Sequence, residues 1–325
     1  MATQPLLSVI LPAYNVEKYI VECLDSLLAQ IPAPNELIVI NDGSTDSTLT
    51  LLEKHYADYP HVKIVTIPNG GLGNARDTGI AMAEGEFIFC CDPDDIVCDG
   101  FFAELSQVAS QHPDLELFCF NSLMFDDDNP TQTWSKVEHH QFGQLPSRSV
   151  LCDLLRSGAY TSATWNYVLR RQVIVDYQMK YVARLHEDHA YTLEAFLRTR
   201  HAWVSRNIYY RQRVRQGSLT NSTKGDAFFR RRYEAFIESY DKLNELVTDE
   251  QELRQLRQLY LLHSFRLMIH LSLANGTPVP NYVTEAIYSL GKNLKPGGVV
   301  DWLLLNKPQV YSNLIRIKRG YKKAA

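Results

Sequence analysis

Short apolar stretches alternate with amphipathic stretches over about the first 125 residues, and this alternation constrains the fold more than any other feature of the sequence. Five apolar runs have the length and residue types of buried strands: 7–11, 37–40, 62–67, 87–91 and 115–120. Between these runs, apolar residues recur at the three- and four-residue spacing of amphipathic helices. Strands that alternate with helices predict an α/β fold, in which a mostly parallel, doubly wound sheet is covered on both faces.

Polar turns follow the predicted strands, and ligands bind beyond the carboxyl ends of parallel strands. We therefore expect these turns, although distant in sequence, to lie along one edge of the sheet. Asn15 is expected to cap a helix over 16–30, because asparagine is a favoured residue at that position.

The strand pattern does not continue into the last third of the chain. Residues 226–275 have the apolar spacing of long helices. We therefore divide the chain into an α/β domain over 1–225 and a helical region over 226–325.

Composition excludes several classes of protein. The 33 basic and 37 acidic residues give a net charge of −4, which argues against a nucleic-acid binder. Six cysteines without a C-x-x-C pair predict free thiols rather than disulfides or a zinc site. No apolar run approaches the ~18 residues of a membrane span, and the N-terminus does not resemble a signal sequence. We therefore expect a cytoplasmic protein.

Three carboxylates follow the fourth predicted strand, at Asp92, Asp94 and Asp95. Carboxylates that share a site repel one another unless a cation lies between them. Hard divalent ions such as Mg²⁺ and Mn²⁺ prefer carboxylate oxygens, so the turn predicts a metal that in turn holds a diphosphate. The alternative is an acidic turn that caps the next helix.

Two further residues lie in turns after strands. Asp42 can accept a hydrogen bond from a nucleobase or a ribose hydroxyl, although Asn-Asp-Gly is also a common turn sequence. Arg76 follows the glycine-rich turn at 69–73, whose backbone can approach a ligand closely. This turn follows the third strand and lacks the G-x-G-x-x-G spacing, which argues against a dinucleotide-binding dehydrogenase, and no P-loop sequence is present.

Asp188 stands just before a predicted helix, where the helix dipole stabilises the ionised carboxylate. Such a group is a ready general base at neutral pH, and the alternative is ordinary helix capping. Farther along, Arg211, Arg213 and Arg215 alternate on a predicted strand. Alternate residues share one face, so these guanidinium groups form a row suited to phosphate oxygens. The alternative for the row is a solvated edge strand.

The order and spacing of these signals resemble the family 2 inverting glycosyltransferases of the GT-A fold. The resemblance rests on four segments: 8–15 (SVILPAYN), 40–46 (INDGSTD), 73–79 (GNARDTG) and 92–95 (DPDD). It covers about the first 125 residues and continues more thinly through Trp165-Asn166, Glu187-Asp188 and 213–220.

The resemblance implies that the domain over 1–225 binds a nucleotide-sugar, a UDP-sugar, and is catalytic. The helical region over 226–325 is then expected to contact an acceptor, a membrane or a partner subunit.

For the donor, the resemblance implies that Pro12 and Tyr14 flank the uracil ring, and that Asp42 reads the base. It also implies that Arg76 approaches the uracil or the diphosphate, and that Asp92 contacts the ribose or the sugar.

For the reaction, the resemblance implies that Asp94 binds the Mn²⁺ or Mg²⁺ ion that assists departure of UDP. It implies that Asp188 removes the proton from the acceptor hydroxyl, which then attacks the anomeric carbon with inversion. It further implies that Arg211, Arg213 or Ser218 closes over the diphosphate.

Two residues depart from the family's usual pattern. Asp77 stands where members often have asparagine, and this change affects hydrogen bonding of the loop. Tyr167 stands where many members have lysine, so no acceptor contact is carried over to it.

The C-terminal segment 299–325 combines apolar residues with six basic residues after Trp302, and no acidic residue follows Trp302. Basic and apolar residues together attach segments to anionic membrane surfaces. We therefore predict peripheral contact with the cytoplasmic face of the inner membrane. Such contact suits a glycan or lipid-linked glycan acceptor of bacterial lipopolysaccharide or capsule synthesis. The alternative is a helix packed on the enzyme's own core.

Two other functions remain as hypotheses. A sugar-nucleotide nucleotidyltransferase also uses a doubly wound sheet and a metal, but it needs a glycine-rich phosphate loop after the first strand, where this chain has Pro12-Ala13-Tyr14-Asn15. A non-catalytic UDP-sugar-binding module has the same fold, and retention of Asp94 and Asp188 argues against it.

Overall fold

A computed structural model describes residues 6–34, 36–182, 186–215 and 225–320. The chain forms two compact units, Met1–Asn221 and Ser222–Ala325. Ser218, one of the residues expected to close over the diphosphate, lies outside the described residues.

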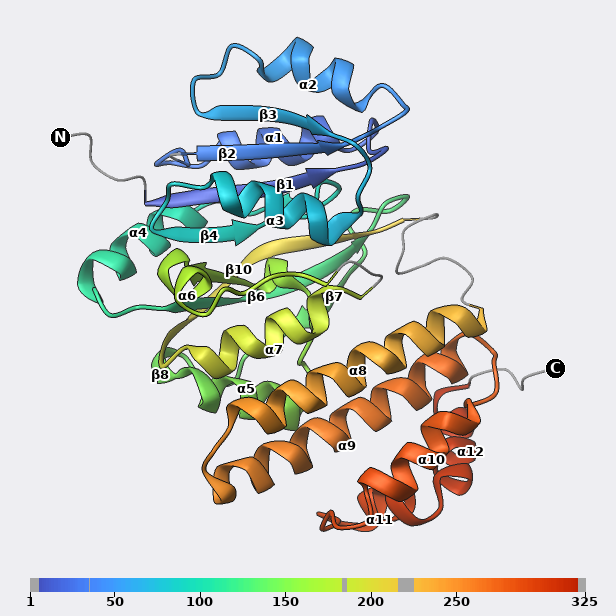
Figure 1. Cartoon of the computed structure of the whole chain (residues 1–325). Coiled ribbons are helices and arrows are strands. Elements are labelled where there is room, and N and C mark those ends of the chain that lie inside the picture. The colour runs from blue at the N-terminus through green and yellow to red at the C-terminus, as the bar shows by residue number, and fades with distance from the viewer. Residues whose placement is uncertain (1–5, 35, 183–185, 216–224, 321–325) are drawn as a thin grey trace. The chain divides into compact units, whose positions relative to one another are not determined.

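The first unit is built on one sheet (Figure 1). Its strands are β1 Leu7–Ala13, β2 Glu36–Asp42, β3 Val62–Ile67, β4 Phe87–Cys90, β5 Ile96–Val97, β6 Leu117–Asp126, β7 Thr133–Val137, β8 Gly143–Pro146, β9 Tyr167–Arg170 and β10 His201–Val214. The strand order is β3-β2-β1-β4-β9-β6-β10-β5, with β7 beside β6 and β8 beside β10.

Most strands of the central sheet run in one direction. β3, β2, β1 and β4 pair in parallel, and so do β6 and β10. β9 runs antiparallel to both β4 and β6, so those two strands share the common direction. β1 and β2 are buried along their whole length, as expected for strands covered on both faces. The mostly parallel α/β fold predicted from the sequence is confirmed.

Helices cover the sheet of the first unit, and Figure 1 shows α3 in front of it and α1 behind it. The helices are α1 Ile20–Leu28, α2 Thr48–Tyr56, α3 Leu72–Met82, α4 Phe101–Gln111, α5 Ser147–Ser157, α6 Arg171–Asp176 and α7 Asp188–Arg198. α3 packs closely because Gly79 faces the sheet: a Cβ atom there would lie 2.5 Å from Cγ2 of Ile10.

The prediction that Asn15 caps the first helix is wrong, because α1 begins only at Ile20. Asn15 instead has a φ of 51°, and its side-chain oxygen accepts hydrogen bonds from the backbone N–H groups of Thr45 and Asp46 at 2.8 and 3.4 Å. The side chain therefore joins the turn after β1 to the turn after β2, a tertiary contact that local propensity does not encode.

The second unit contains the helices α8 Asp226–Leu246, α9 Glu250–Ala274, α10 Asn281–Leu290, α11 Val299–Asn306 and α12 Pro308–Arg319. α8 and α9 lie side by side, and α10, α11 and α12 each contact α9 (Figure 1). The long helices predicted over 226–275 are thus present, as α8 and α9. No helix in the described part of the chain is long and apolar enough to cross a bilayer.

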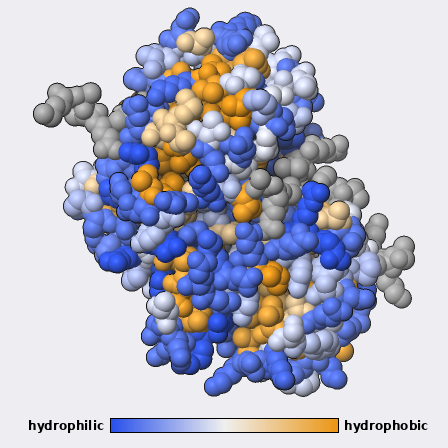
Figure 2. All heavy atoms as spheres, viewed as in Figure 1, coloured by the Kyte–Doolittle hydropathy of each residue, from blue (hydrophilic) through white to orange (hydrophobic). Residues whose placement is uncertain are grey.

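Hydrophilic residues cover most of the face shown in Figure 2, and apolar residues gather there in separate patches.

All six cysteines are free thiols, as the sequence predicted.

Candidate active site

The acidic turn after β4 has two partly buried carboxylates. The side chain of Asp92 is 25% exposed and that of Asp94 is 17% exposed. Burial raises the pKa of Asp92 above its usual range; Arg76 opposes this shift, and the nearby Asp94 reinforces it. The predicted repulsion between these carboxylates is therefore present in the folded chain. Nε of Arg215 lies 2.7 Å from Oδ2 of Asp94 and offsets its charge.

The third carboxylate of this turn, Asp95, faces the interior. Its oxygens accept hydrogen bonds from the hydroxyl of Tyr210 at 2.6 Å and from the backbone N–H of Arg213 at 2.7 Å. Burial, reinforced by Asp94 and Asp92, holds its pKa well above the usual range. Asp95 therefore ties the acidic turn to β10 rather than pointing toward a ligand.

Arg76 connects two carboxylates that are far apart in sequence. Its Nη2 lies 2.8 Å from Oδ1 of Asp92, and its Nη1 lies 2.7 Å from Oε1 of Glu187. The guanidinium side chain is only 3% exposed and lies 5.4 Å from the ring of Tyr181. Although burial by itself lowers the pKa of Arg76, the charge of Asp92 raises it well above the usual value, so the group stays protonated.

This bridge determines where the expected base lies. Glu187 is buried and immediately precedes Asp188, the first residue of α7, whose side chain is partly exposed. Since Arg76 joins Glu187 to Asp92, the end of β4 and the start of α7 are held together. Gly73 permits a close approach nearby, because a Cβ atom there would lie 3.0 Å from the carbonyl oxygen of Val182.

Asp42 ends β2 and is buried, with 3% of its surface exposed. Its two carboxylate oxygens accept hydrogen bonds from the backbone N–H groups of Gly70 and Gly71, at 2.8 and 2.9 Å. Gly71 has a φ of 86°, which glycine adopts without strain. Asp42 therefore holds the glycine-rich turn in place, and each of its oxygens keeps acceptor capacity for a second donor.

Pro12 and Tyr14 lie at the end of β1, next to the end of β2. Pro12 is buried within the strand, and Tyr14 is 48% exposed just beyond it. Since Ala13 pairs with Asn41, Tyr14 and Asp42 follow neighbouring residues of adjacent parallel strands. The structure thus brings together the residues expected around the base.

The arginine row lies at the end of β10, with Arg215 just beyond the strand, and contacts aromatic rings. Arg211 and Arg213 lie with Cζ 4.7 and 4.6 Å from the centre of the Phe125 ring. Arg213 and Arg215 lie 5.0 and 4.9 Å from the centre of the Tyr19 ring. Cation–π contacts of this kind hold guanidinium groups on one face. The three arginines therefore share a face, as their alternation predicted.

The members of the row differ in how fully they are engaged. Arg213 is buried, and its Nη1 and Nη2 form ion pairs with Asp127 at 2.7 Å and Glu22 at 2.5 Å, while its Nε donates to the carbonyl oxygen of Asp94 at 2.8 Å. Arg211 is partly exposed and donates to the carbonyl oxygen of Pro130 at 3.3 Å. Arg213 is therefore built into the scaffold, and Arg211 is the more accessible of the two.

The donors around Asp94 indicate what kind of metal site they suit. Within the described residues, no group of three or more His, Cys, Asp or Glu side chains is arranged to hold an ion. Magnesium is commonly held by one or two carboxylates together with substrate phosphates. Asp94 offers the carboxylate oxygens that such an ion takes.

Both departures from the family pattern have structural explanations. Oδ1 of Asp77 accepts a hydrogen bond from the backbone N–H of Tyr181 at 3.2 Å, so it supports the segment before α7. Tyr167 is buried, and its hydroxyl lies 3.2 Å from Oγ1 of Thr192. Tyr167 thus belongs to the core.

The sequence did not identify several residues that hold the site. Glu187 was noted only within a motif, and no role was expected for Glu22 or Asp127. Glu22 lies 191 positions from Arg213 in the sequence, and no local pattern connects them. Tyr210 also escaped notice, although it stacks on Trp165 with ring centres 4.5 Å apart and binds Asp95.

Comparisons with known proteins agree with this architecture. The uncharacterized glycosyltransferase YibD of Escherichia coli is 31% identical over 255 residues, which are 75% of this chain and 72% of YibD. The chondroitin synthase of Escherichia coli is 42% identical over 93 residues, or 29% of this chain and 14% of the synthase.

Among solved structures, Staphylococcus aureus TarS in complex with UDP-GlcNAc superposes with a TM-score of 0.71 at 21% identity. The match covers 97% of this chain and 92% of the TarS chain and shows the shared fold. Residues 8–237 match glycosyl transferase family 2, and the chain therefore belongs to that family.

Proposed function

We propose that this glycosyltransferase moves a sugar from a UDP-sugar to a hydroxyl group of a glycan or lipid-linked glycan acceptor in polysaccharide synthesis, with inversion at the anomeric carbon. The observation that carries the proposal is the Arg76 bridge. This buried contact joins Asp92, the expected donor contact, to Glu187, which adjoins the expected base Asp188.

The proposal of a UDP-sugar donor draws on the residues at the ends of β1 and β2. Tyr14 supplies an exposed ring on which a uracil can stack. Asp42, at the end of the neighbouring strand, supplies a carboxylate that can accept a hydrogen bond from the edge of the base. TarS, which has the same fold, was solved with UDP-GlcNAc. For the acceptor, similarity to a chondroitin synthase over 93 residues favours a growing glycan.

In the proposed reaction, the acceptor hydroxyl oxygen forms a bond to the anomeric carbon as the bond from that carbon to the diphosphate oxygen breaks. The carboxylate of Asp188 takes the hydroxyl proton, and UDP leaves with the bonding electrons. Attack opposite the leaving group inverts the configuration. General-base assistance of this kind contributes about 10²–10⁴-fold to the rate.

Asp94 would hold a Mn²⁺ or Mg²⁺ ion together with the diphosphate, and such an ion stabilises the charge that develops on the leaving group. Arg215 forms an ion pair with Asp94, and Arg211, on the same face, would contact phosphate oxygens.

The test is UDP release from a panel of UDP-sugars with Mn²⁺ or Mg²⁺, with and without glycan acceptors. We expect one donor to be turned over and Asp94→Asn and Asp188→Asn each to lower the rate at least about 100-fold. Asp58→Asn, at an exposed position on the first unit, is the matched control. Product anomeric configuration is read by NMR. UDP binding without turnover on any donor would instead identify a non-catalytic module.

We also propose that α12 makes peripheral contact with an anionic membrane. Val310, Leu314 and Ile317 are 46%, 49% and 76% exposed, at the spacing of one helical stripe. Pro308 and Tyr311 are buried on the other side of the same helix. An exposed apolar stripe on a helix already packed by its opposite face suits the boundary between headgroups and acyl chains.

Flotation with phosphatidylglycerol and phosphatidylcholine vesicles tests this contact. We expect the intact chain to float with the anionic vesicles and the Leu314→Gln/Ile317→Gln variant to stay in solution. Ile31→Gln removes an equally exposed apolar side chain of the first unit and should float like the native chain. Equal flotation of all three proteins would exclude α12 as the contact.

A further inference from the structure

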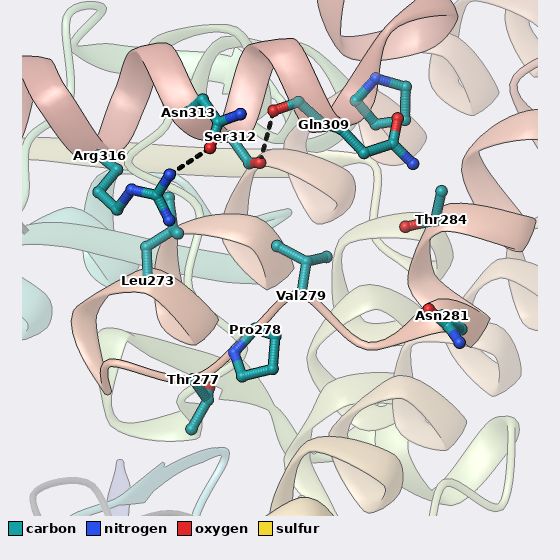
Figure 3. Close-up of a pocket in the computed structure, with 11 residues that line it drawn as sticks. Leu273, Thr277, Pro278, Val279, Asn281, Thr284, Gln309, Ser312, Asn313 and Arg316 are labelled. Carbon is teal, nitrogen blue, oxygen red and sulfur yellow. Dashed lines mark hydrogen bonds between the residues drawn. The ribbon is translucent and has the colours of Figure 1, made fainter. Parts of the chain in front are cut away.

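A pocket of about 350 Å³ lies within the second unit, and none of its lining residues is assigned a role in transfer (Figure 3). One wall comes from α12, and the other comes from the end of α9, the connection 277–279 and the start of α10. Ligand pockets in proteins usually measure about 300–1,000 Å³, so this one has room for a single sugar ring with a small substituent.

The neutral polar groups of the pocket match the hydroxyl groups of a sugar. Three hydroxyl and three amide side chains line it: Thr277, Thr284, Ser312, Asn281, Gln309 and Asn313. Such groups both donate and accept hydrogen bonds, as sugar hydroxyls require. The apolar residues Leu273 and Val279 lie among them and suit the C–H face of a sugar ring.

The charge of the pocket is positive. Arg316 is its only charged lining residue among those the structure describes. Figure 3 shows the guanidinium beside Asn313, to whose side-chain oxygen it donates a hydrogen bond. Within residues 225–320, Arg316 forms no ion pair with a carboxylate. A guanidinium that keeps donors available favours a phosphate or carboxylate ligand.

We propose that this pocket binds a saccharide unit that carries a negative charge, either a sugar phosphate or a uronate, and so holds part of a glycan on the second unit. The neutral lining recognises the ring, and Arg316 recognises the charged group. The two possible sources of charge correspond to a phosphate-linked carrier and to an acidic residue within a polysaccharide. This inference does not depend on the proposed donor or base, because binding is measurable without catalysis.

The test is isothermal titration of the intact chain with glucose 1-phosphate, glucuronate, glucose and inorganic phosphate. We expect one of the two charged sugars to bind more tightly than both glucose and inorganic phosphate. Loss of a charge-assisted hydrogen bond should weaken that binding at least about tenfold in Arg316→Gln. Arg254→Gln removes an exposed arginine of α9 and should bind like the native chain.

Thr284→Val removes a neutral partner with little change in shape and should weaken binding severalfold without altering the charge. Tighter binding of glucose 1-phosphate assigns a phosphate-linked source, and tighter binding of glucuronate assigns an acidic residue. The inference is overturned if no charged sugar binds saturably, or if inorganic phosphate binds as tightly as the sugars. Equal affinities of Arg316→Gln and Arg254→Gln would overturn it as well. UDP-release activity of the native chain, measured in parallel, separates this failure from failure of the proposed function.

Discussion

Replacing Glu187 by glutamine tests whether the Arg76 bridge stabilises the first unit. Arg76 is 3% exposed and balanced by two carboxylates, Asp92 and Glu187. Breaking a buried ion pair costs about 3–5 kcal/mol, because an uncompensated charge is left behind. In Glu187→Gln, Arg76 keeps Asp92 and a neutral acceptor, so we expect a smaller loss of about 2 kcal/mol in the free energy of unfolding. That loss is a factor of about 30 in the folding equilibrium.

The assay is urea unfolding followed by tryptophan fluorescence, since Trp165 is buried in the same unit. Glu86→Gln is the matched control. Its carboxylate lies in the same unit, is 41% exposed and pairs with Arg170, so its loss should cost less than about 1 kcal/mol. If both variants lose the same stability, Asp92 alone neutralises Arg76 and the reasoning fails. Glu187→Gln should also lower the rate of UDP release, because α7 loses its anchor.

Three further results are expected. Asp42→Asn should lower the free energy of unfolding, measured in urea, by about 1–3 kcal/mol. The new amide NH₂ group is a donor, and it would face a backbone N–H of the glycine-rich turn that is also a donor. Burial lowers the pKa of His139 and of His263 to about 4. As the pH falls, these histidines therefore bind protons in the unfolded chain before they do so in the folded chain. Stability should therefore fall as the pH drops from about 6.5 toward 4, and unfolding curves at several pH values should show a shallower fall in His139→Gln/His263→Gln. Arg215→Gln should tighten Mn²⁺ binding severalfold in titrations without UDP, because the Arg215 guanidinium no longer competes with the metal for Asp94. An unchanged affinity for Mn²⁺ would contradict this prediction.

The sequence predicted β1, β2, β3, β4 and β6, whose signal is local, but it did not predict β5, β7, β8 or β9. Buried parallel strands need unbroken apolar runs, and the run at 37–40 lies within β2, which is buried along its whole length. Turn residues between such runs follow strand ends, so the polar groups of the first unit were expected along one edge of the sheet. The prediction for Asn15 failed because a side chain that can cap a helix can equally bind a neighbouring turn, and only the fold decides between them.

The sequence by itself therefore determined the α/β architecture, the residues at the strand ends and the excess of acidic groups after β4. Only the tertiary structure decided how these charges are balanced. Asp92, Glu187 and Arg76 meet because the fold brings α3, the turn after β4 and the residue before α7 together. Arg213 likewise meets Glu22, which lies 191 positions earlier in the sequence. The spacing of apolar residues shows which face of a helix or strand is buried, but it does not show which other segment that face packs against. Charge pairing between distant segments depends on their distance in space, and chain folding alone sets that distance.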